Sequence, residues 1–214
     1  MKKVIYIIFA LLLILIGLYS CRKYLLKRTT AKVYVTEKGS NKVVENASVA
    51  LMEVDPGEFL GVPSYTLIEN CMTDNNGYCE FEFKHDNSAS YEVQAKHDSY
   101  YVNREKRSYK VEKGKNNEID IPLQPEAWLK VYVKNVNQEY NRLTLGSIGI
   151  PSGGGGTFYG MSVDTFTIAR RFGNYTKKLS YSVYQSGQSY EDWNHEEIDI
   201  YCSAHDTTEY TIEY

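Results

Sequence analysis

The sequence has few of the residues that mark several common protein classes. Of its 214 residues, 4 are Cys and 5 are Pro, and 24 basic side chains are slightly outnumbered by 27 acidic ones. So few cysteines exclude a cysteine-stapled miniprotein, and so little proline, with only 15 Gly, excludes a collagen-like chain. The formal charge of -3 excludes a basic nucleic-acid binder, and 43% hydrophobic residues exclude a wholly disordered chain.

Long apolar runs are also absent, except at the N-terminus. Lys2 and Lys3 precede 17 residues without a charge, Val4–Ser20, and Cys21 follows directly. As a helix this run reaches about 25 Å, which is short of the roughly 30 Å hydrocarbon core of a bilayer. We therefore expect residues 1–20 to be a cleaved signal peptide rather than a permanent membrane span.

The end of that segment, Leu18-Tyr19-Ser20-Cys21, resembles the lipobox of bacterial lipoproteins. The resemblance implies that Cys21 is lipidated and becomes the mature N-terminus, with a basic tether over residues 21–29. Tyr19 is an atypical lipobox residue, and the positive-inside rule keeps basic clusters such as the one at 22–28 in the cytoplasm. An uncleaved signal anchor is therefore the alternative.

The charge of the remaining chain argues against nucleic acid as a partner. Residues 1–20 carry two Lys and no acidic residue, so their removal changes the formal charge from -3 to -5. A nucleic-acid binder instead needs Lys and Arg to neutralise phosphates.

Leucine is scarce after the N-terminal segment, where only 10 Leu accompany many Tyr, Val, Thr and Ile. Such usage favours strands over helices. Polar and apolar residues alternate at 32–35, 48–51, 80–83, 91–95, 118–121, 130–133, 179–184, 197–200 and 209–212. This period of two predicts strands that bury one face, and no segment after residue 30 has a sustained helical stripe. The sequence therefore predicts an all-β fold of antiparallel sandwiches.

Two sandwich domains are predicted, over residues 30–124 and 125–214. Lys-Val-Tyr-Val occurs twice, as does Glu-Ile-Asp-Ile, which is compatible with two domains of similar plan. Pro122 and Pro125 bracket two residues, and we interpret this stretch as a short, stiff linker before a new strand at Trp128. Each domain has about 90 residues, enough for one modest core.

Three segments of the first domain, Val43–Val49, Thr73–Phe81 and Tyr91–Ala95, resemble the carboxypeptidase regulatory-like domain. The most specific piece is the Thr-Asp-x-x-Gly-aromatic turn at Thr73–Tyr78. The resemblance implies a transthyretin-like sandwich of seven strands over residues 30–124, typically a non-catalytic module of envelope proteins. No catalytic residue transfers with it. The second domain is similar only to Ig-like sandwiches in general.

The cysteines suggest a disulfide near that turn. Cys71 and Cys79 lie on either side of it, so if the flanking strands pair as a hairpin, their Cβ atoms come within bridging distance. An exported location permits oxidation. We expect a disulfide, with two separately buried thiols as the alternative. Cys202 is then unpaired and is expected to be a small buried apolar residue.

Residues typical of catalysis or metal binding do not combine into a motif. Asp74–Gly77 has too few oxygen ligands for calcium and is typical of a turn. Gly153–Gly156 is not followed by the Lys and Ser or Thr of a phosphate-binding loop. The four His, His85, His97, His195 and His205, do not lie at zinc-binding spacings. We therefore expect no metal, no cofactor and no enzymatic activity.

Tyrosine is in surplus, at 20 residues. Tyr100 and Tyr101 precede a polar run at 103–107, and Tyr190 and Trp193 lie in or beside another at 185–192. Aromatic side chains beside amide and charged groups on loops can form platforms for sugars or peptides. These four residues are the candidate ligand-binding residues. The alternative is that strand Tyr rings pack in the core and leave only their hydroxyls wet.

These features predict a lipid-anchored protein exported to the bacterial cell envelope, with the outer membrane as its expected location. Its sandwich domains are expected to display loops to a glycan or an envelope protein without catalysis. Two alternatives stay open. One is a structural subunit that assembles through exposed sheet edges, and the other is a hydrolase whose residues come from separated segments.

Overall fold

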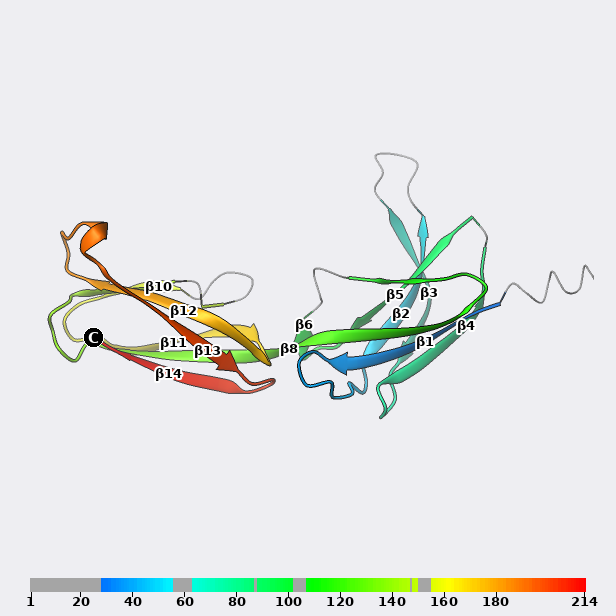
Figure 1. Ribbon diagram of the computed structural model, residues 1–214, viewed down its shortest axis with the longest axis horizontal. Helices are drawn as coiled ribbons and strands as arrows, with labels where there is room; N and C mark the ends of the chain where they lie inside the picture. Colours follow the sequence, from blue (N-terminus) through cyan, green and yellow to red (C-terminus); the bar gives the residue numbers. More distant parts are fainter. Residues whose placement is uncertain (1–27, 56–62, 87, 102–106, 147, 150–154) are drawn as a thin grey trace, which may run out of the picture. The chain divides into compact units, whose positions relative to one another are not determined.

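The computed structural model describes residues 28–214 except 56–62, 87, 102–106, 147 and 150–154. These residues form an all-β protein, as predicted, whose single helical element is the short 3-10 turn η1 (Tyr190–Asp192). They divide into two compact units (Figure 1). Unit 1 comprises the described residues of 1–36, 43–95 and 104–121, and unit 2 those of 37–42, 96–103 and 122–214.

Unit 1 is a sandwich of two sheets. Its strands are β1 (Arg28–Glu37), β2 (Ser48–Asp55), β3 (Ser64–Met72), β4 (Tyr78–Lys84), β5 (Ser90–Lys96), β7 (Tyr109–Val111) and the first part of β8 (Asn116–Lys134). One sheet places β1 between β8 and β4, and the other has the order β3-β2-β5-β7. The described part of unit 1 thus uses seven strands, the number implied by the resemblance to the carboxypeptidase regulatory-like domain.

Alternation along the strands explains which side chains form the unit 1 core. In β1 the buried residues Ala31, Val33 and Val35 alternate with outward-facing Lys32 and Tyr34. The facing sheet contributes Val49, Leu51 and Val93 in the same way. Because successive side chains of a strand point to opposite faces, a period of two in the sequence becomes one apolar layer and one wet layer.

Unit 2 is a second two-sheet arrangement. Its further strands are β6 (Tyr100–Tyr101), β9 (Arg142–Leu145), β10 (Gly156–Tyr159), β11 (Asp164–Phe172), β12 (Tyr175–Tyr184), β13 (Asn194–Cys202) and β14 (Thr207–Glu213). In one sheet β8 lies between antiparallel β11 and parallel β14, and in the other the order is β10-β9-β12-β13. Between these layers lies a core that includes Leu129, Val131, Leu143, Leu179 and Ile212.

Strand β8 runs through the stretch that the sequence analysis interpreted as a linker. That interpretation was wrong, because Pro122 and Pro125 lie inside a continuous strand. Proline lacks the N–H of a ladder hydrogen bond but keeps its carbonyl, and the Pro125 carbonyl accepts a hydrogen bond from the Gly173 N–H at 2.8 Å. Residues 37–42 and the described part of 96–103 belong to unit 2. A domain boundary at 124/125 stays a prediction.

Cys71 and Cys79 form a disulfide, with 6.5 Å between their Cα atoms. Their strands β3 and β4 lie in different sheets, so the expected hairpin pairing is wrong and the disulfide joins the two sheets of unit 1. In the turn between them, the Asp74 carboxylate accepts hydrogen bonds from the N–H groups of Asn76 and Tyr78, each at 2.9 Å. Those bonds lower the pKa of Asp74. Cys202 is a buried free thiol.

Several predicted features lie outside the described residues. They are the signal peptide, the lipidated Cys21 and most of the basic tether, the polar run at 103–106, and Gly153 and Gly154 of the glycine run. No helix in the part of the chain that the structure describes is long and apolar enough to cross a membrane.

Candidate functional site

Two loops of unit 2 are held against each other where β8 and β12 end. One is the β8–β9 loop, 135–141, and the other is the β12–β13 loop, 185–193. The Gln185 side chain donates to the Glu139 carbonyl at 2.5 Å, and the Ser186 N–H donates to Asn141 Oδ1 at 2.9 Å. These bonds connect loops that are far apart in the sequence into one surface.

Asn135 gives the β8–β9 loop its shape. Its Oδ1 accepts from the Gln138 N–H at 3.0 Å, and its Nδ2 donates to the Tyr140 carbonyl at 2.6 Å. Gln138 has a φ of 56°, in the left-handed region. In the other loop, Gln188 Oε1 accepts from the Gln185 N–H at 2.7 Å. Both loops therefore have defined conformations set by side-chain amides.

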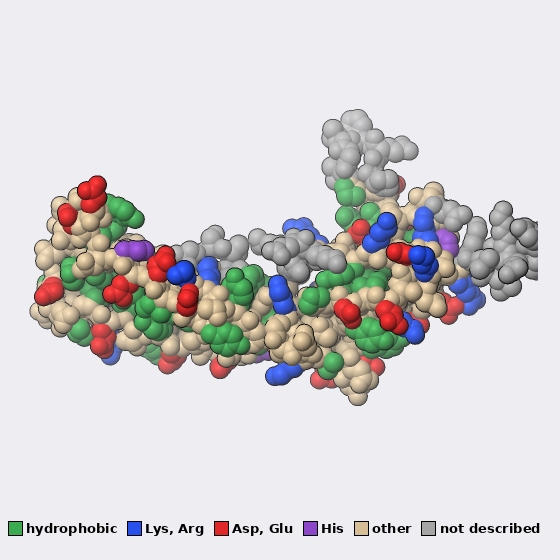
Figure 2. All heavy atoms as spheres, in the orientation of Figure 1, with side chains coloured by type: hydrophobic (Ala, Val, Ile, Leu, Met, Phe, Trp, Pro, Cys, Tyr) green, Lys and Arg blue, Asp and Glu red, His purple; other side chains and the backbone are tan. Residues whose placement is uncertain are grey.

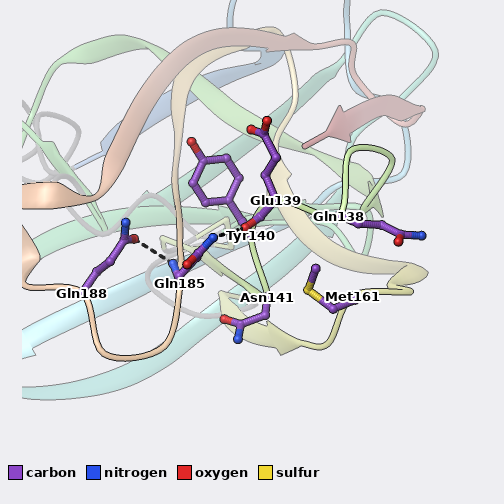
Figure 3. A pocket seen from close by; sticks show the side chains of 7 residues that line it. All are labelled: Gln138, Glu139, Tyr140, Asn141, Met161, Gln185 and Gln188. Atoms are coloured by element: carbon purple, nitrogen blue, oxygen red, sulfur yellow. Dashed lines mark hydrogen bonds between the residues drawn. The ribbon is translucent and has the colours of Figure 1, made fainter.

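The first of two pockets at this surface, the amide pocket, has a volume of about 610 Å³. Figure 3 shows Gln185 between two partners: its backbone N–H donates to the Gln188 side chain, and its side-chain amide donates to the Glu139 carbonyl. The side chains that line it are mostly amides: Gln138, Glu139, Tyr140, Asn141, Met161, Gln185 and Gln188. An amide group both donates and accepts hydrogen bonds, so this pocket can bind hydroxyl and carbonyl groups of a ligand.

The second pocket, the tyrosine pocket, has a volume of about 420 Å³ and shares Tyr140 with the amide pocket. The Tyr140 hydroxyl accepts a hydrogen bond from Asn194 Nδ2 at 2.6 Å. The pocket is lined by Asn137, Tyr140, Tyr181, Val183, Trp193, Asn194, His195, Glu196, Glu213 and Tyr214. Both volumes fall in the range of small-ligand sites, which is about 300 to 1,000 Å³.

Tyr190 and Trp193, two of the predicted ligand-binding residues, lie together beside these pockets. The Trp193 ring is stacked parallel on Tyr184, with centroids 3.7 Å apart, and Tyr190 lies 4.9 Å from Trp193. Tyr190 is 76% exposed. The stack fixes the indole, while the Tyr190 ring is free to contact a ligand. Figure 2 shows acidic and hydrophobic side chains next to each other at this tip, at the upper left of the view.

Two phenols of the tyrosine pocket, Tyr181 and Tyr214, have raised pKa values. Burial and a hydrogen bond to Glu196 raise the pKa of Tyr181, whose hydroxyl donates to that carboxylate. Burial also raises the pKa of Tyr214. Both phenols are therefore protonated at neutral pH, and the Tyr181 O–H is engaged with the carboxylate of Glu196.

Tyr100 and Tyr101 lie elsewhere in unit 2 and contact the chain's own groups. The Tyr100 hydroxyl donates to Glu37 at 3.1 Å, while the Tyr101 ring packs on Phe172 and beneath Arg170. Tyr100 pairs with Pro125, near the middle of β8, whereas Tyr214 bonds Lys134 at its end. The nine residue steps from Pro125 to Lys134 span about 30 Å. Tyr214 lines the same pocket as Trp193, so Tyr100 and Tyr101 lie far from Tyr190 and Trp193. The four predicted aromatic residues thus do not form one platform.

Glu37, at 4% exposure, is the centre of a buried polar network in unit 2. Its carboxylate accepts from Ser40 at 2.6 Å and from Asn174 at 2.8 Å, and it contacts His205 Nε2 at 3.0 Å and Tyr100. Burial alone raises the pKa of Glu37, but these four hydrogen bonds outweigh it and lower the pKa. Each Glu37 oxygen is satisfied, which is the pattern of a structural network.

Two of the other histidines have partners outside this network: His85 contacts Thr29 at 2.9 Å, and His195 contacts Ser182 at 3.1 Å. His97 lies edge-on to Tyr100, which belongs to the network. No group of three or more His, Cys, Asp or Glu in the described part of the chain is arranged to hold a metal ion.

Comparisons with known proteins give no family. No family model and no curated protein matches the chain, and this includes models of the carboxypeptidase regulatory-like domain. Solved structures of similar shape include the Bacillus anthracis TIE protein, at 11% identity over 87% of this chain and 34% of that one, with a TM-score of 0.38. This chain thus spans about a third of the length of that protein.

Pilins are also among the similar structures. GBS52, the minor pilin of Streptococcus agalactiae, is 11% identical over 86% of this chain and 94% of its own, with a TM-score of 0.40. The shaft pilin SpaA of Lactobacillus rhamnosus GG is 8% identical over 87% and 96%, with a TM-score of 0.32. Scores this low carry no argument about function.

The sequence pointed to only part of this surface. It singled out the aromatic residues around 185–192 but missed Tyr140, Tyr181 and Tyr214. The polar run Asn135–Asn141 between two strands was the available signal for the first loop. No sequence signal pointed to Tyr214, because its position at this surface depends on the parallel pairing of β14 with β8.

Proposed function

We propose that this protein is a non-enzymatic protein of the bacterial cell envelope whose unit 2 binds a glycan at the amide and tyrosine pockets. The observation that supports it is the joined surface of two loops, which places an exposed Tyr190 ring beside two pockets lined by amides and phenols. An aromatic ring packs on the apolar face of a sugar, while amides bond its hydroxyls.

The chemistry of the lining favours a glycan over an apolar ligand. Four of the seven residues of the amide pocket carry side-chain amides, and only Met161 is aliphatic in character. Pockets for apolar small molecules are instead lined mainly by hydrophobic side chains. A polyhydroxylated ligand matches this density of donors and acceptors.

Attachment to a membrane is the second part of the proposal. The segment before Cys21 supports it through its basic start, apolar run and lipobox-like end. The Cys71–Cys79 disulfide is compatible with export, because disulfides persist in oxidising compartments. A lipidated Cys21 with several acyl chains would hold the protein stably at the outer membrane, whereas one chain binds only marginally.

A glycan array tests the proposal with the full chain in detergent. We expect binding to a subset of glycans, and we expect Tyr190→Ala to weaken it by about tenfold, because the variant removes an exposed ring whose stacking energy is about 1 kcal/mol or more. Tyr65→Ala is the matched control, since Tyr65 is exposed in unit 1. If the folded wild-type chain and the folded Tyr65→Ala variant bind no glycan, the proposal is contradicted.

Strand pairing at β3 is a second candidate function, and the exposure of this edge favours it. β3 is an edge strand of its sheet and pairs only with β2 among the described strands. It exposes Tyr65, Leu67, Ile68 and Met72. An exposed apolar edge strand is a template for adding a strand from another chain.

Sedimentation velocity over a range of concentrations tests whether the β3 edge pairs with a second copy of the chain. If β3 pairs with a second copy, we expect dimers in the wild type and their loss in Leu67→Lys, because a charge on the edge opposes pairing. Val136→Lys is the control, since Val136 is similarly exposed in unit 2. A monomer at all concentrations, or dimers equally abundant in both variants, rules out self-pairing at β3.

A further inference from the structure

Two hydrogen-bond donors of the tyrosine pocket have no partner. Trp193 Nε1 and the Tyr214 hydroxyl are shielded from solvent, and neither bonds any group in the described part of the chain. Both residues line the same pocket. Buried polar groups in proteins are nearly always hydrogen-bonded, so two orphan donors at one cavity call for acceptors from outside the chain.

The positions of these donors are fixed by the fold. Tyr214 is 5% exposed, its N–H donates to the Lys134 carbonyl at 3.0 Å, and its backbone oxygen accepts from the Val136 N–H at 2.7 Å. Trp193 is held by the parallel stack on Tyr184. Both donors are therefore held in place at the wall of the pocket, and a ligand oxygen reaches them when a neighbouring side chain of the pocket changes its rotamer.

We propose that the tyrosine pocket holds one uncharged sugar residue of the glycan, whose oxygen atoms accept hydrogen bonds from Trp193 Nε1–H and Tyr214 O–H. This inference rests on the proposed glycan binding and names the class of sugar bound. A ring or acetamido oxygen and a hydroxyl of one sugar residue supply the two acceptors.

The charges around the pocket select against acidic sugars. Glu196 and Glu213 line the tyrosine pocket, and Glu139 lines the adjoining amide pocket. Neither pocket has a Lys or Arg among its described lining residues. Arg142 lies nearby, but its guanidinium is placed over the rings of Tyr159 and Tyr184. A uronic acid, sialic acid or sulfated sugar would place an anion beside these carboxylates, and among the described lining residues only His195 is able to carry a positive charge.

The same carboxylates suit a neutral sugar. Glu196 accepts from the Tyr181 hydroxyl and keeps further lone pairs for a sugar O–H. Asn137 and Asn194 add amides at the rim. A sugar hydroxyl donates to Glu196 while accepting from Tyr214 or Trp193, so the donors and acceptors of the pocket and the ligand balance.

The indole N–H signal of Trp193 provides a direct readout. The chain has 2 Trp, so a nitrogen–proton correlation spectrum of the labelled full chain in detergent contains two indole signals. The indole signal that is lost in the Trp193→Phe variant belongs to Trp193, and the remaining one belongs to Trp128. The probes are neutral oligosaccharides of glucose, galactose, mannose and N-acetylglucosamine, and matched oligosaccharides that contain a uronic acid. We expect a neutral probe to shift the Trp193 signal while the Trp128 signal stays in place.

Tyr214→Phe tests the second donor. Removal of an unpaired hydroxyl does not destabilise the free protein, so its melting temperature should stay the same or rise, while affinity for the neutral probe falls about tenfold. Tyr201→Phe is the control, because Tyr201 is exposed on β13 and does not line the pocket.

The outcomes separate this inference from the proposed function. Glycan binding that depends on Tyr190 but leaves the Trp193 signal and the Tyr214→Phe affinity unchanged would overturn the inference and keep the proposed function. A preference for the acidic probes would do the same. Absence of binding to every glycan would overturn both.

Discussion

Glu37→Ala is expected to lower the free energy of unfolding by about 3 kcal/mol, because four polar partners lose a buried, charged acceptor. Ser40, Asn174, His205 and Tyr100 all contact this carboxylate. Urea unfolding followed by tryptophan fluorescence measures the effect in the appropriate unit, since Trp128 and Trp193 both belong to unit 2.

The stability difference between wild type and Glu37→Ala should depend on pH with a definite sign. The hydrogen bonds hold the folded-state pKa of Glu37 below its ordinary value of 4.5. A carboxyl with a depressed pKa stabilises the fold fully above the unfolded-state value, and this contribution is lost as the pH falls through the folded-state value. We therefore expect a constant difference near neutral pH and a smaller one below pH 4.5.

Glu191→Ala provides the control for both measurements. Glu191 is exposed and belongs to unit 2, like Glu37, so the variant should unfold with the same midpoint as wild type. If Glu37→Ala were as stable as Glu191→Ala, the network around Glu37 would contribute nothing to stability. The interpretation of this cluster as structural would then fail, and the rival hypothesis of an unrecognised catalytic site would gain weight.

The second large effect is expected from the disulfide of unit 1. Replacing both Cys71 and Cys79 by Ser should destabilise unit 1 by about 2 to 3 kcal/mol, since closing a short loop removes entropy from the unfolded chain. Hydrogen exchange of β3 and β4 should become faster in this variant, because the disulfide joins the two sheets through these strands. Exchange rates are measured by mass spectrometry on peptides of each strand.

Ser48→Ala is a suitable control for the disulfide variant. Its hydroxyl bonds the Asn70 side chain between β2 and β3 at an exposed position, so its loss should change stability by less than about 1 kcal/mol. Equal exchange in β3 and β4 with and without the disulfide would show that the sheets hold together through packing alone.

The strands with strict alternation were predictable from the sequence. The segments 32–35, 80–83 and 197–200 lie in β1, β4 and β13, because an alternating pattern buries only one face of a strand. β3 was not among the alternating segments, since as an edge strand it is exposed along nearly its whole length and has no such pattern. The prediction of a proline linker was wrong, because Pro122 and Pro125 lie inside strand β8. A proline can occupy a strand position where the ladder needs no N–H.

The candidate site was only partly predictable. Tyr190 and Trp193 are close in the sequence, so a local pattern found them, and they lie together in the structure. Tyr140 and Tyr214 reach the same surface only through strand pairing over long sequence separations. Tyr100 and Tyr101 had the same local pattern as Tyr190, but their surroundings could not be read from neighbouring residues.

Hydrogen exchange of the full chain with and without a bound glycan tests the central claim most directly. The claim is that the joined loops of unit 2 form the binding surface. We expect slower exchange at the backbone amides of 135–141 and 185–194, with no change in β3 or around Glu37. Protection confined to β3, or spread over unit 1, would contradict the account.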